Sequence, residues 1–366
     1  MSAAASAAGT PAPAGALVVV PLTGIGQVRT GDDLATLLLA ACERAGTPPR
    51  DDDVLVVSSK VLAKALGLWH ADREAAVVQE SRGVVAERRT ANGTTRIVRS
   101  AAGPVMAAAG VDASNTGPDA DGRVLVLPHD PDVQAARLRT ALEQACGKRP
   151  AVLLTDTSGR PWRVGQTDFA LGCAGLLPTD DLRGALDADG VALHVTVRAV
   201  ADELAAAAEL VKGKADGVPA ALVRGAGHLV REQDGPGAAG LVRFDAADWF
   251  ATGTVESVRA ALGCPPGTAG VEPAPAVPDD DVAAVLARAV AVVGHGAAAE
   301  PDLDGARALA VGAGVVIVTG PLLPAARVAE RVVVACRAEG VRTRVRVDGA
   351  TLVVEPADRA RGPAAG

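Results

Sequence analysis

Residues 151–168 read AVLLTDTSGRPWRVGQTD, and this segment decides how the fold is interpreted. Its first five residues, Ala151 to Thr155, are a short apolar run between Pro150 and a polar turn, which predicts a buried strand. Asp156 and Thr157 follow at once. A carboxylate and a hydroxyl group are therefore expected at the point where a core strand ends.

The polar residues after this strand predict a binding site. Arg160, Arg163 and Asp168 all follow within twelve residues of Asp156. Hard oxygen ligands beside guanidinium groups suit a divalent cation that holds a polyphosphate. The alternative is an Asx-type turn with a surface ion pair. The density of charged side chains in so short a segment favours the cation site.

Strand and helix patterns alternate on both sides of this segment. Residues 84–100 alternate around Asn92-Gly93, which is a typical hairpin turn. This order of elements predicts an α+β fold (mixed α/β) that includes antiparallel strands. Further strands are predicted at residues 16–20, 54–57, 124–127, 191–197 and 220–223, and helices at 32–45, from 60 onward, at 132–146 and at 200–212.

A proline-rich stretch predicts how the chain divides. Residues 17–250 form the main domain, 251–281 the linker and 282–356 a small α/β appendage of unknown role. The remaining residues, 1–16 and 357–366, are expected to be disordered tails. Within the appendage we expect helices at 282–293 and 325–338, a strand at Val315 and a hairpin that turns at Asp348-Gly349.

Composition excludes several classes of protein. The 366-residue chain has a net charge of −7 and only 2% aromatic residues, which argues against a nucleic-acid-binding surface. Its five cysteines include no CxxC pair, so neither a disulfide framework nor a zinc site is expected. The N-terminus lacks the basic start of a signal peptide, and the uncharged run 308–326 is interrupted by Gly and Pro. We therefore expect a cytoplasmic protein with no membrane partner.

A second polar cluster follows the predicted strand 54–57. Ser58, Ser59 and Lys60 lie at a strand-to-helix junction, and Lys64 lies one turn further along the same helix face. Free N–H groups at a helix N-terminus, together with hydroxyl and ammonium groups, favour phosphate. The cluster is not a P-loop, because GxxxxGK[ST] does not occur in the chain. The alternative is a pair of N-capping serines with solvated lysines.

Three more segments place polar groups in loops. The glycine of Leu22-Thr23-Gly24-Ile25 permits close backbone approach to a ligand. Asp112 and Asn115 follow a run of small residues and supply a carboxylate and an amide. The turn at residues 212–219 follows a predicted helix end, where its lysines either cap the helix dipole or contact phosphate.

Together these segments resemble the coenzyme F420-0:L-glutamate ligase family, from about Val18 to Val230 and in the family's order. The resemblance is carried by Leu22-Thr23-Gly24-Ile25, Ser58-Ser59-Lys60 with Lys64, Val111-Asp112-Ala113-Ser114-Asn115, Asp156 to Arg163, and Ala201-Asp202-Glu203-Leu204 through Lys214. It implies a two-lobed ligase core with mixed sheets that forms a homodimer and binds GTP and two divalent ions, Mg²⁺ or Mn²⁺.

The resemblance also implies roles for individual residues. Asp112 and Asp156 hold one metal ion, with Thr157 near the second. The chemistry of the residues themselves predicts the remaining roles: charge on the transferred phosphoryl group is offset by Arg160, Arg163, Lys60 and Lys64. No general base is obvious in the sequence, and Asp168 is the candidate. The residues expected to bind GTP are Leu22, Thr23, Gly24, Ile25, Ser58, Ser59, Lys60, Lys64, Asn115, Lys212, Gly213, Lys214, Ala215, Asp216, Gly217, Val218 and Pro219.

This chain departs from the family pattern at three places. Leu66 stands where the family often has Glu, and Lys214 stands where some members carry an acidic ligand of the second metal ion. Two-domain bacterial relatives continue into an FMN-binding, nitroreductase-like domain. The segment after the linker is too short for such a domain, so no FMN is expected.

The reaction implied is amide formation. GTP phosphorylates the terminal carboxylate of a lactyl-phospho or dehydro deazaflavin F420 precursor, and the amine of L-glutamate attacks the acyl phosphate; further γ-linked glutamates can follow. One alternative is a non-catalytic nucleotide- or deazaflavin-binding paralogue that lost turnover through Leu66 and Lys214. Another is a ligase on the same scaffold that joins a different amine. Retention of Asp112, Asp156 and Thr157 argues against the non-catalytic paralogue.

Overall fold

The structure is a computed structural model of the chain, and it describes residues 15–91, 93–243, 248–276, 281–297, 303, 305–311 and 315–357. Most of the two predicted tails, and Asn92 of the predicted hairpin turn, lie outside these residues. The chain divides into two compact units. Unit 1 comprises Met1–Glu80 and Ser100–Arg243, and unit 2 comprises Ser81–Arg99 and Phe244–Gly366.

Unit 1 is built on a five-stranded sheet with the order β1-β12-β2-β8-β9. Strands β2 and β8 run parallel, and the other neighbouring pairs are antiparallel. The strands span Val18–Pro21 (β1), Ala220–Arg224 (β12), Val54–Ser58 (β2), Ala151–Arg160 (β8) and Arg163–Ala174 (β9).

Helices cover both faces of this sheet, which explains why its central strands are apolar throughout. Successive side chains of a strand point to opposite faces. Leu55 and Val57 of β2 belong to one core cluster with α1 (Leu34–Arg44) and α4 (Pro131–Cys146). Val54 and Val56 belong to another with α5 (Val200–Lys212). Strands buried on both faces have continuous Val and Leu runs in place of alternation.

Shorter elements complete unit 1. Strands β3 and β7 pair with each other, as do β10 and β11. The elements are α2 (Ser59–Leu66), β3 (Trp69–His70), α3 (Arg73–Gln79), β6 (Val105–Ala107), η1 (Ala108–Gly110), η2 (Pro118–Ala120), β7 (Val124–Leu125), β10 (Asp180–Asp181), β11 (Val197–Arg198), η3 (Gly227–Leu229) and η4 (Ala238–Leu241).

The predicted end of the central strand is wrong, because β8 continues past Asp156 to Arg160. Beyond Thr155 the strand keeps a partner, since β9 pairs with it along the whole length. The register shifts between Leu154 and Thr155, so the polar segment starts at an irregularity of the ladder and not at its end. Sequence reasoning missed β9 because its first half is polar and exposed.

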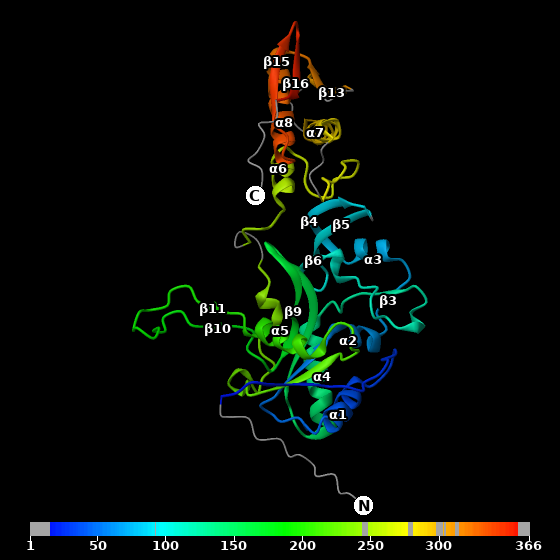
Figure 1. Cartoon of the computed structure of the whole chain (residues 1–366), viewed down its shortest axis with the longest axis vertical. Coiled ribbons are helices and arrows are strands. Elements are labelled where there is room, and N and C mark those ends of the chain that lie inside the picture. The colour runs from blue at the N-terminus through cyan, green and yellow to red at the C-terminus, as the bar shows by residue number, and fades with distance from the viewer. Residues whose placement is uncertain are drawn as a thin grey trace, which may run out of the picture. The chain divides into compact units, whose positions relative to one another are not determined.

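Residues 180–198, here called the arm, extend from unit 1 as a long loop closed by β10 and β11 (Figure 1). The strand predicted at 191–197 is wrong except for Val197, which lies in β11. The backbone of this segment is hydrogen-bonded within the arm at Val191, Leu193 and Thr196, but these bonds form no continuous ladder beyond the pair of β10 and β11. Val195 is 87% exposed and lies outside the paired strands.

Unit 2 combines the hairpin of β4 (Ser81–Thr90) and β5 (Gly93–Ser100) with the C-terminal residues. The C-terminal part has an antiparallel sheet of order β13-β14-β16-β15, and α7 and α8 share its core cluster. The elements are α6 (Thr254–Ala261), α7 (Val282–Ala297), β13 (Arg307–Val311), β14 (Val315–Thr319), α8 (Leu322–Ala338), β15 (Thr343–Asp348) and β16 (Thr351–Pro356).

The predicted α+β class is confirmed by these sheets and helices. The helices and strands predicted for residues 282–356 are present, including the hairpin that turns at Asp348-Gly349. The range 251–281 contains α6, and Ala274 and Ala276 hydrogen-bond to Arg89 of β4. None of the helices in the described part of the chain has the length and apolar character that a bilayer crossing requires.

Candidate functional site

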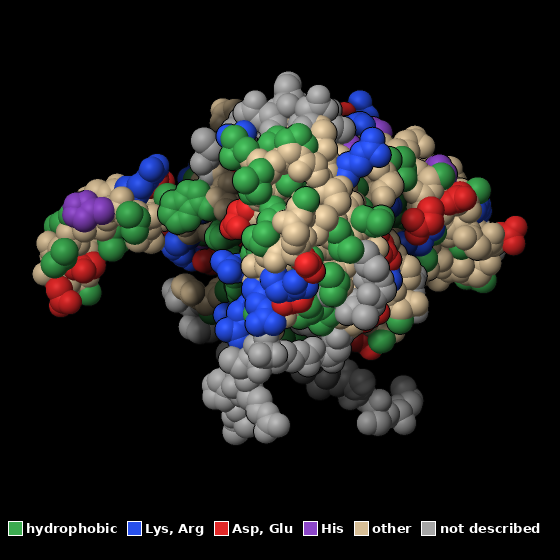
Figure 2. Space-filling model, turned by 90° about the horizontal axis from the view of Figure 1, so that it is seen from above, with side chains coloured by type: hydrophobic (Ala, Val, Ile, Leu, Met, Phe, Trp, Pro, Cys, Tyr) green, Lys and Arg blue, Asp and Glu red, His purple; other side chains and the backbone are tan. Residues whose placement is uncertain are grey.

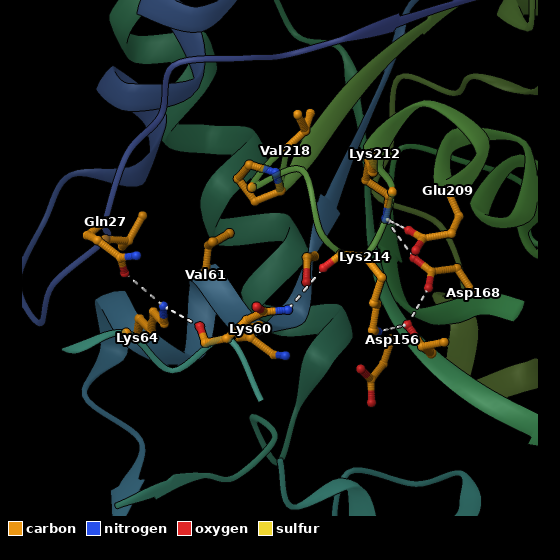
Figure 3. A pocket seen from close by; sticks show the side chains of 18 of the residues that line it. Gln27, Lys60, Val61, Lys64, Asp156, Asp168, Glu209, Lys212, Lys214 and Val218 are labelled. Carbon is orange, nitrogen blue, oxygen red and sulfur yellow. Dashed lines mark hydrogen bonds and ion pairs between the residues drawn. The ribbon is translucent and has the colours of Figure 1, made fainter. Parts of the chain in front are cut away.

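A cavity of about 450 Å³ lies in unit 1 where α2, the polar second half of β8 and the turn after α5 meet (Figure 3). This volume is typical of a small-molecule site. The lining residues are Gly26, Gln27, Val28, Ser58, Lys60, Val61, Lys64, Asn115, Gly117, Asp156, Thr157, Asp168, Glu209, Lys212, Gly213, Lys214, Gly217, Val218 and Pro219.

The cavity gathers most of the lysines of the chain. The sequence contains five lysines among its 36 Lys and Arg residues, and Lys60, Lys64, Lys212 and Lys214 all line this cavity. The fifth, Lys148, forms an exposed ion pair with Asp51. A compact ammonium group is a common phosphate ligand. In a chain that uses arginine for nearly all its cations, this concentration of lysine marks the cavity as a site for a charged ligand.

The two lysines of α2 hold the loop around residue 114. Lys60 Nζ lies 2.6 Å from Asp112 Oδ2 and donates to the carbonyl oxygen of Ser114 at 2.8 Å. Lys64 Nζ donates to the carbonyl oxygen of Asn115 at 2.8 Å and to Gln27 Oε1 at 3.3 Å. Burial, with the nearby Lys60 charge, lowers the pKa of Lys64. Both predicted α2 lysines thus point into the cavity.

A buried ion pair joins α5 to the central hairpin. Lys212 Nζ lies 2.6 Å from Asp168 Oδ2, and both side chains are 3% exposed. Thr155 and Thr157 donate their hydroxyl protons to the two oxygens of Asp168, at 2.8 and 2.7 Å. Burial alone would raise the pKa of Asp168, but the Lys212 charge and these hydrogen bonds lower it. The pair therefore fixes Thr157 at the cavity wall.

These contacts bear on the predicted role of Asp168 as a general base. A base accepts a proton most readily when its pKa lies near the working pH. The pKa of Asp168 is lowered, and both of its oxygens already accept hydrogen bonds. The contacts favour a positioning role, although the role of the residue remains a prediction.

Asp112 and Asp156, the residues predicted to bind a metal ion, are brought together. They line one small cavity with Ser59 and Lys60, next to the larger one. Burial is the largest cause that raises the pKa of Asp156 to about 6, and the Asp112 charge contributes to the same rise. A cation between the two carboxylates would offset both effects.

The donor set fits a hard divalent ion. Among the described residues no three His, Cys, Asp or Glu side chains form a metal cluster. An ion at Asp112 and Asp156 would therefore complete its shell with hydroxyl, water or phosphate oxygens. That mixture is typical of Mg²⁺, which usually keeps water and phosphate ligands beside one or two carboxylates.

Several predicted site residues lie elsewhere. Arg160 and Arg163 are exposed at the turn of the β8–β9 hairpin and do not line the cavity. Leu22 and Ile25 belong to the hydrophobic core, and the next three residues, 26–28, line the cavity. Ala215 and Asp216 are exposed and outside the lining set. Their assignments remain predictions.

Sequence reasoning missed Gln27 and Glu209, which line the cavity together with Gly26, Val28, Val61 and Gly117. Glu209 Oε2 lies 3.3 Å from Lys212 Nζ, one helical turn away. That i,i+3 spacing of opposite charges was readable in the sequence. Gln27 gave no such signal, because only the fold brings it beside Lys64.

The chain is similar in sequence to proteins of one family. The family model for F420-0:Gamma-glutamyl ligase matches residues 24–74 and 69–225. The coenzyme F420:L-glutamate ligase of Haloarcula marismortui is 39% identical over 234 residues, which cover 56% of this chain and 86% of the relative. The proteins of the same name from Methanothermobacter thermautotrophicus and Archaeoglobus fulgidus are 37% and 36% identical, over 58% and 57% of this chain and 90% and 87% of the relatives.

The matched region contains the whole cavity, since every lining residue falls between residues 24 and 225. It includes the ion pair of Lys212 and Asp168 and the carboxylates Asp112 and Asp156. The C-terminal part of unit 2 lies beyond it. The chain therefore belongs to the F420-0:gamma-glutamyl ligase family.

Proposed function

We propose that the chain is a GTP-dependent ligase that forms an amide bond between L-glutamate and the coenzyme F420-0 precursor. The names of its relatives supply the glutamate and the deazaflavin. The observation that carries the proposal is a cavity of about 450 Å³ lined by four lysines, with Asp156 shared between this cavity and the small cavity that Asp112 lines. Guanine as the base rests on the family resemblance.

The side chains can be assigned parts in phosphoryl transfer. Lys64 and Lys214 hydrogen-bond to neutral oxygens, so their charges are available to a polyphosphate. A Mg²⁺ or Mn²⁺ ion held by Asp112 and Asp156 would offset charge on the nucleotide phosphates. Lys60 and Asp112 form an ion pair at 2.6 Å. For the metal ion to bind Asp112, the Lys60 ammonium group would therefore have to leave this carboxylate, and it would then turn toward phosphate.

The proposed reaction has two steps. A carboxylate oxygen of the precursor attacks the γ-phosphorus of GTP, and GDP leaves with the bridging oxygen. The amine of L-glutamate then attacks the acyl carbon, phosphate leaves, and the nitrogen loses a proton. The lysines would stabilise charge on the phosphoryl oxygens in the first step. Lys212 and Asp168 would keep Thr157 in place throughout.

The decisive test is a product assay with the purified full-length chain. We expect GDP release from GTP and Mn²⁺ only when both the deazaflavin precursor and L-glutamate are present. Mass spectrometry should show the precursor with one or more added glutamates. GDP release without a new amide would leave only a nucleotide hydrolase, and tight nucleotide binding without turnover would support a non-catalytic paralogue.

Removal of residues 271–366 is expected to preserve GTP-dependent ligation, because every residue that lines the cavity lies in unit 1. Val258, Leu262 and Cys264 pack in the same core cluster as α7 and α8, so the shortened chain should be less soluble. The measurement is ligation rate per folded chain, with absorbance as a check on flavin. FMN in the full-length protein, or loss of ligation in a folded truncated chain, would contradict the expectation.

A homodimer is the proposed assembly, and the arm is its expected contact. Leu186, Val191 and Val195 in the arm are 67%, 60% and 87% exposed. Figure 2 shows hydrophobic side chains among acidic ones on the arm, which projects to the left. Replacing these three residues with Asp should turn the dimer into a monomer of 36.5 kDa, measured by light scattering. A wild-type chain that is already monomeric would contradict the proposal.

A further inference from the structure

The ammonium group of Lys214 places a positive charge beside Thr157. Its nitrogen donates to Thr157 Oγ1 at 2.5 Å, while the Thr157 hydroxyl proton goes to Asp168 Oδ1. The oxygen of Thr157 therefore accepts from Lys214 on the side that faces the cavity. The backbone of Lys214 is held as well, since Asn115 Nδ2 donates to the Lys214 carbonyl oxygen at 3.2 Å.

Asp156 faces a different cation environment on each side. Toward Asp112, the two carboxylates line the small cavity, and no ammonium group other than that of Lys60 lines it among the described residues. Toward Thr157 lies Lys214, which hydrogen-bonds to the Thr157 hydroxyl and whose charge acts on Asp156 (Figure 3). Like charges at close range repel strongly in a partly buried site. A divalent ion fits the Asp112 side, where two carboxylates supply negative charge once Lys60 has turned from Asp112 toward phosphate. On the Thr157 side, Lys214 opposes such an ion.

We propose that the ammonium group of Lys214 takes the place of a divalent ion next to Thr157, so that the site binds one divalent ion, between Asp112 and Asp156. This inference rests on the proposed function, because it assigns how the same site compensates the charge of the nucleotide. Lysine suits the role: its ammonium is a compact charge on a flexible stem and can follow the phosphate.

Charge pairing in the cavity supports this assignment. Lys212 is paired with Asp168 and Glu209, and Lys60 is paired with Asp112. Lys214 makes its hydrogen bond to a hydroxyl oxygen. A phosphate oxygen can replace that hydroxyl as acceptor without leaving a carboxylate unpaired. Lys214 can therefore act as a cation toward the nucleotide while a single divalent ion occupies the carboxylate pair.

The test counts the ions. Mn²⁺ is titrated into the full-length chain with a non-hydrolysable GTP analogue, and bound ions per chain are measured by calorimetry and by the EPR signal of free Mn²⁺. We expect one ion for the wild type and for Lys214→Met, and two for Lys214→Glu, which adds a carboxylate at that position. For Lys214→Met the analogue should bind about tenfold more weakly or worse, because a charge-assisted hydrogen bond is lost.

Lys148→Glu is the matched control, since Lys148 lies in an exposed pair outside the cavity. It should bind one ion. Two ions in the wild type, or one ion in a folded Lys214→Glu variant, would overturn the inference. In either case ligation by the wild type would leave the proposed function standing. A wild-type chain that binds neither Mn²⁺ nor the analogue would overturn both.

Discussion

Asp156→Asn is expected to reduce ligation by about a hundredfold or more while the chain remains folded. The side chain lines both cavities, beside Asp112 in one and Thr157 in the other. An amide keeps its shape but removes one negative charge from the proposed metal site, and hard divalent ions bind largely through charge. The measurements are the ligation rate over a range of Mn²⁺ concentrations and the affinity for Mn²⁺.

The same substitution should stabilise the metal-free chain. Burial raises the pKa of Asp156 to about 6, so the folded state disfavours the ionised carboxylate. The free energy of unfolding therefore falls as the pH rises from about 4 to about 6 and stays lowered above that range. Because Asn carries no charge, the variant should be about 1 to 2 kcal/mol more stable than the wild type near pH 7.5. The difference should shrink toward pH 5.

Urea denaturation in EDTA at both pH values measures this difference. Asp51→Asn is the control, because Asp51 is an exposed partner of Lys148, and it should leave ligation unchanged. Normal turnover of Asp156→Asn at low Mn²⁺ concentration would remove Asp156 from the metal site. If the variant were less stable than the wild type near pH 7.5, the buried, ionised carboxylate of Asp156 would not destabilise the folded state as expected.

Lys212→Met should be the most destabilising single change at the site. Lys212 and Asp168 are both 3% exposed, so loss of the ammonium leaves a buried carboxylate without its counter-charge. Breaking a buried pair in this way typically costs about 3 to 5 kcal/mol. Thr155 also loses the hydrogen bond from Lys212 at 2.9 Å. The free energy of unfolding, measured by urea denaturation near pH 7.5, gives the size of the effect.

Adding Asp168→Asn to the Lys212→Met chain should restore part of the lost stability, since no unpaired charge then remains. Lys148→Met provides the exposed comparison and should change the free energy of unfolding by less than about 1 kcal/mol. If Lys212→Met and Lys148→Met were equally mild, the pair would contribute little to the fold. Its proposed part in holding Thr157 would then fail as well.

Local patterns in the sequence predicted four of the five strands in the main sheet of unit 1, all except β9. The runs at 54–57 and 220–223 became β2 and β12 because strands buried on both faces must be continuously apolar. The run at 191–197 looked similar, yet most of it lies outside any continuous strand pairing and more than half of its residues are exposed. The difference lies in pairing over long sequence distances, which no short window of residues contains.

The site also contains residues that the sequence predicted and contacts that only the structure shows. Lys60 and Lys64 were predictable from helical spacing, and the structure places both in the cavity. The pairing of Lys212 with Asp168 joins residues 44 positions apart, and only the approach of α5 to β9 creates it. Lys214 stood out in the sequence as a departure from the family pattern. Its contact with Thr157 becomes visible only in three dimensions.

The two parts of unit 2 are far apart in the sequence, so the ribosome makes one of them well before the other. The β4–β5 hairpin lies within residues 81–99, while the rest of the unit begins at Phe244. Val85 accepts a hydrogen bond from Gly253, and Arg88 pairs with Glu256. At ribosomal speeds of about 5 to 20 residues per second, the hairpin emerges on the order of ten to thirty seconds before these partners. Until then the outer edge of β4 resembles an aggregation template, so a chaperone that binds nascent strands should matter most during this interval.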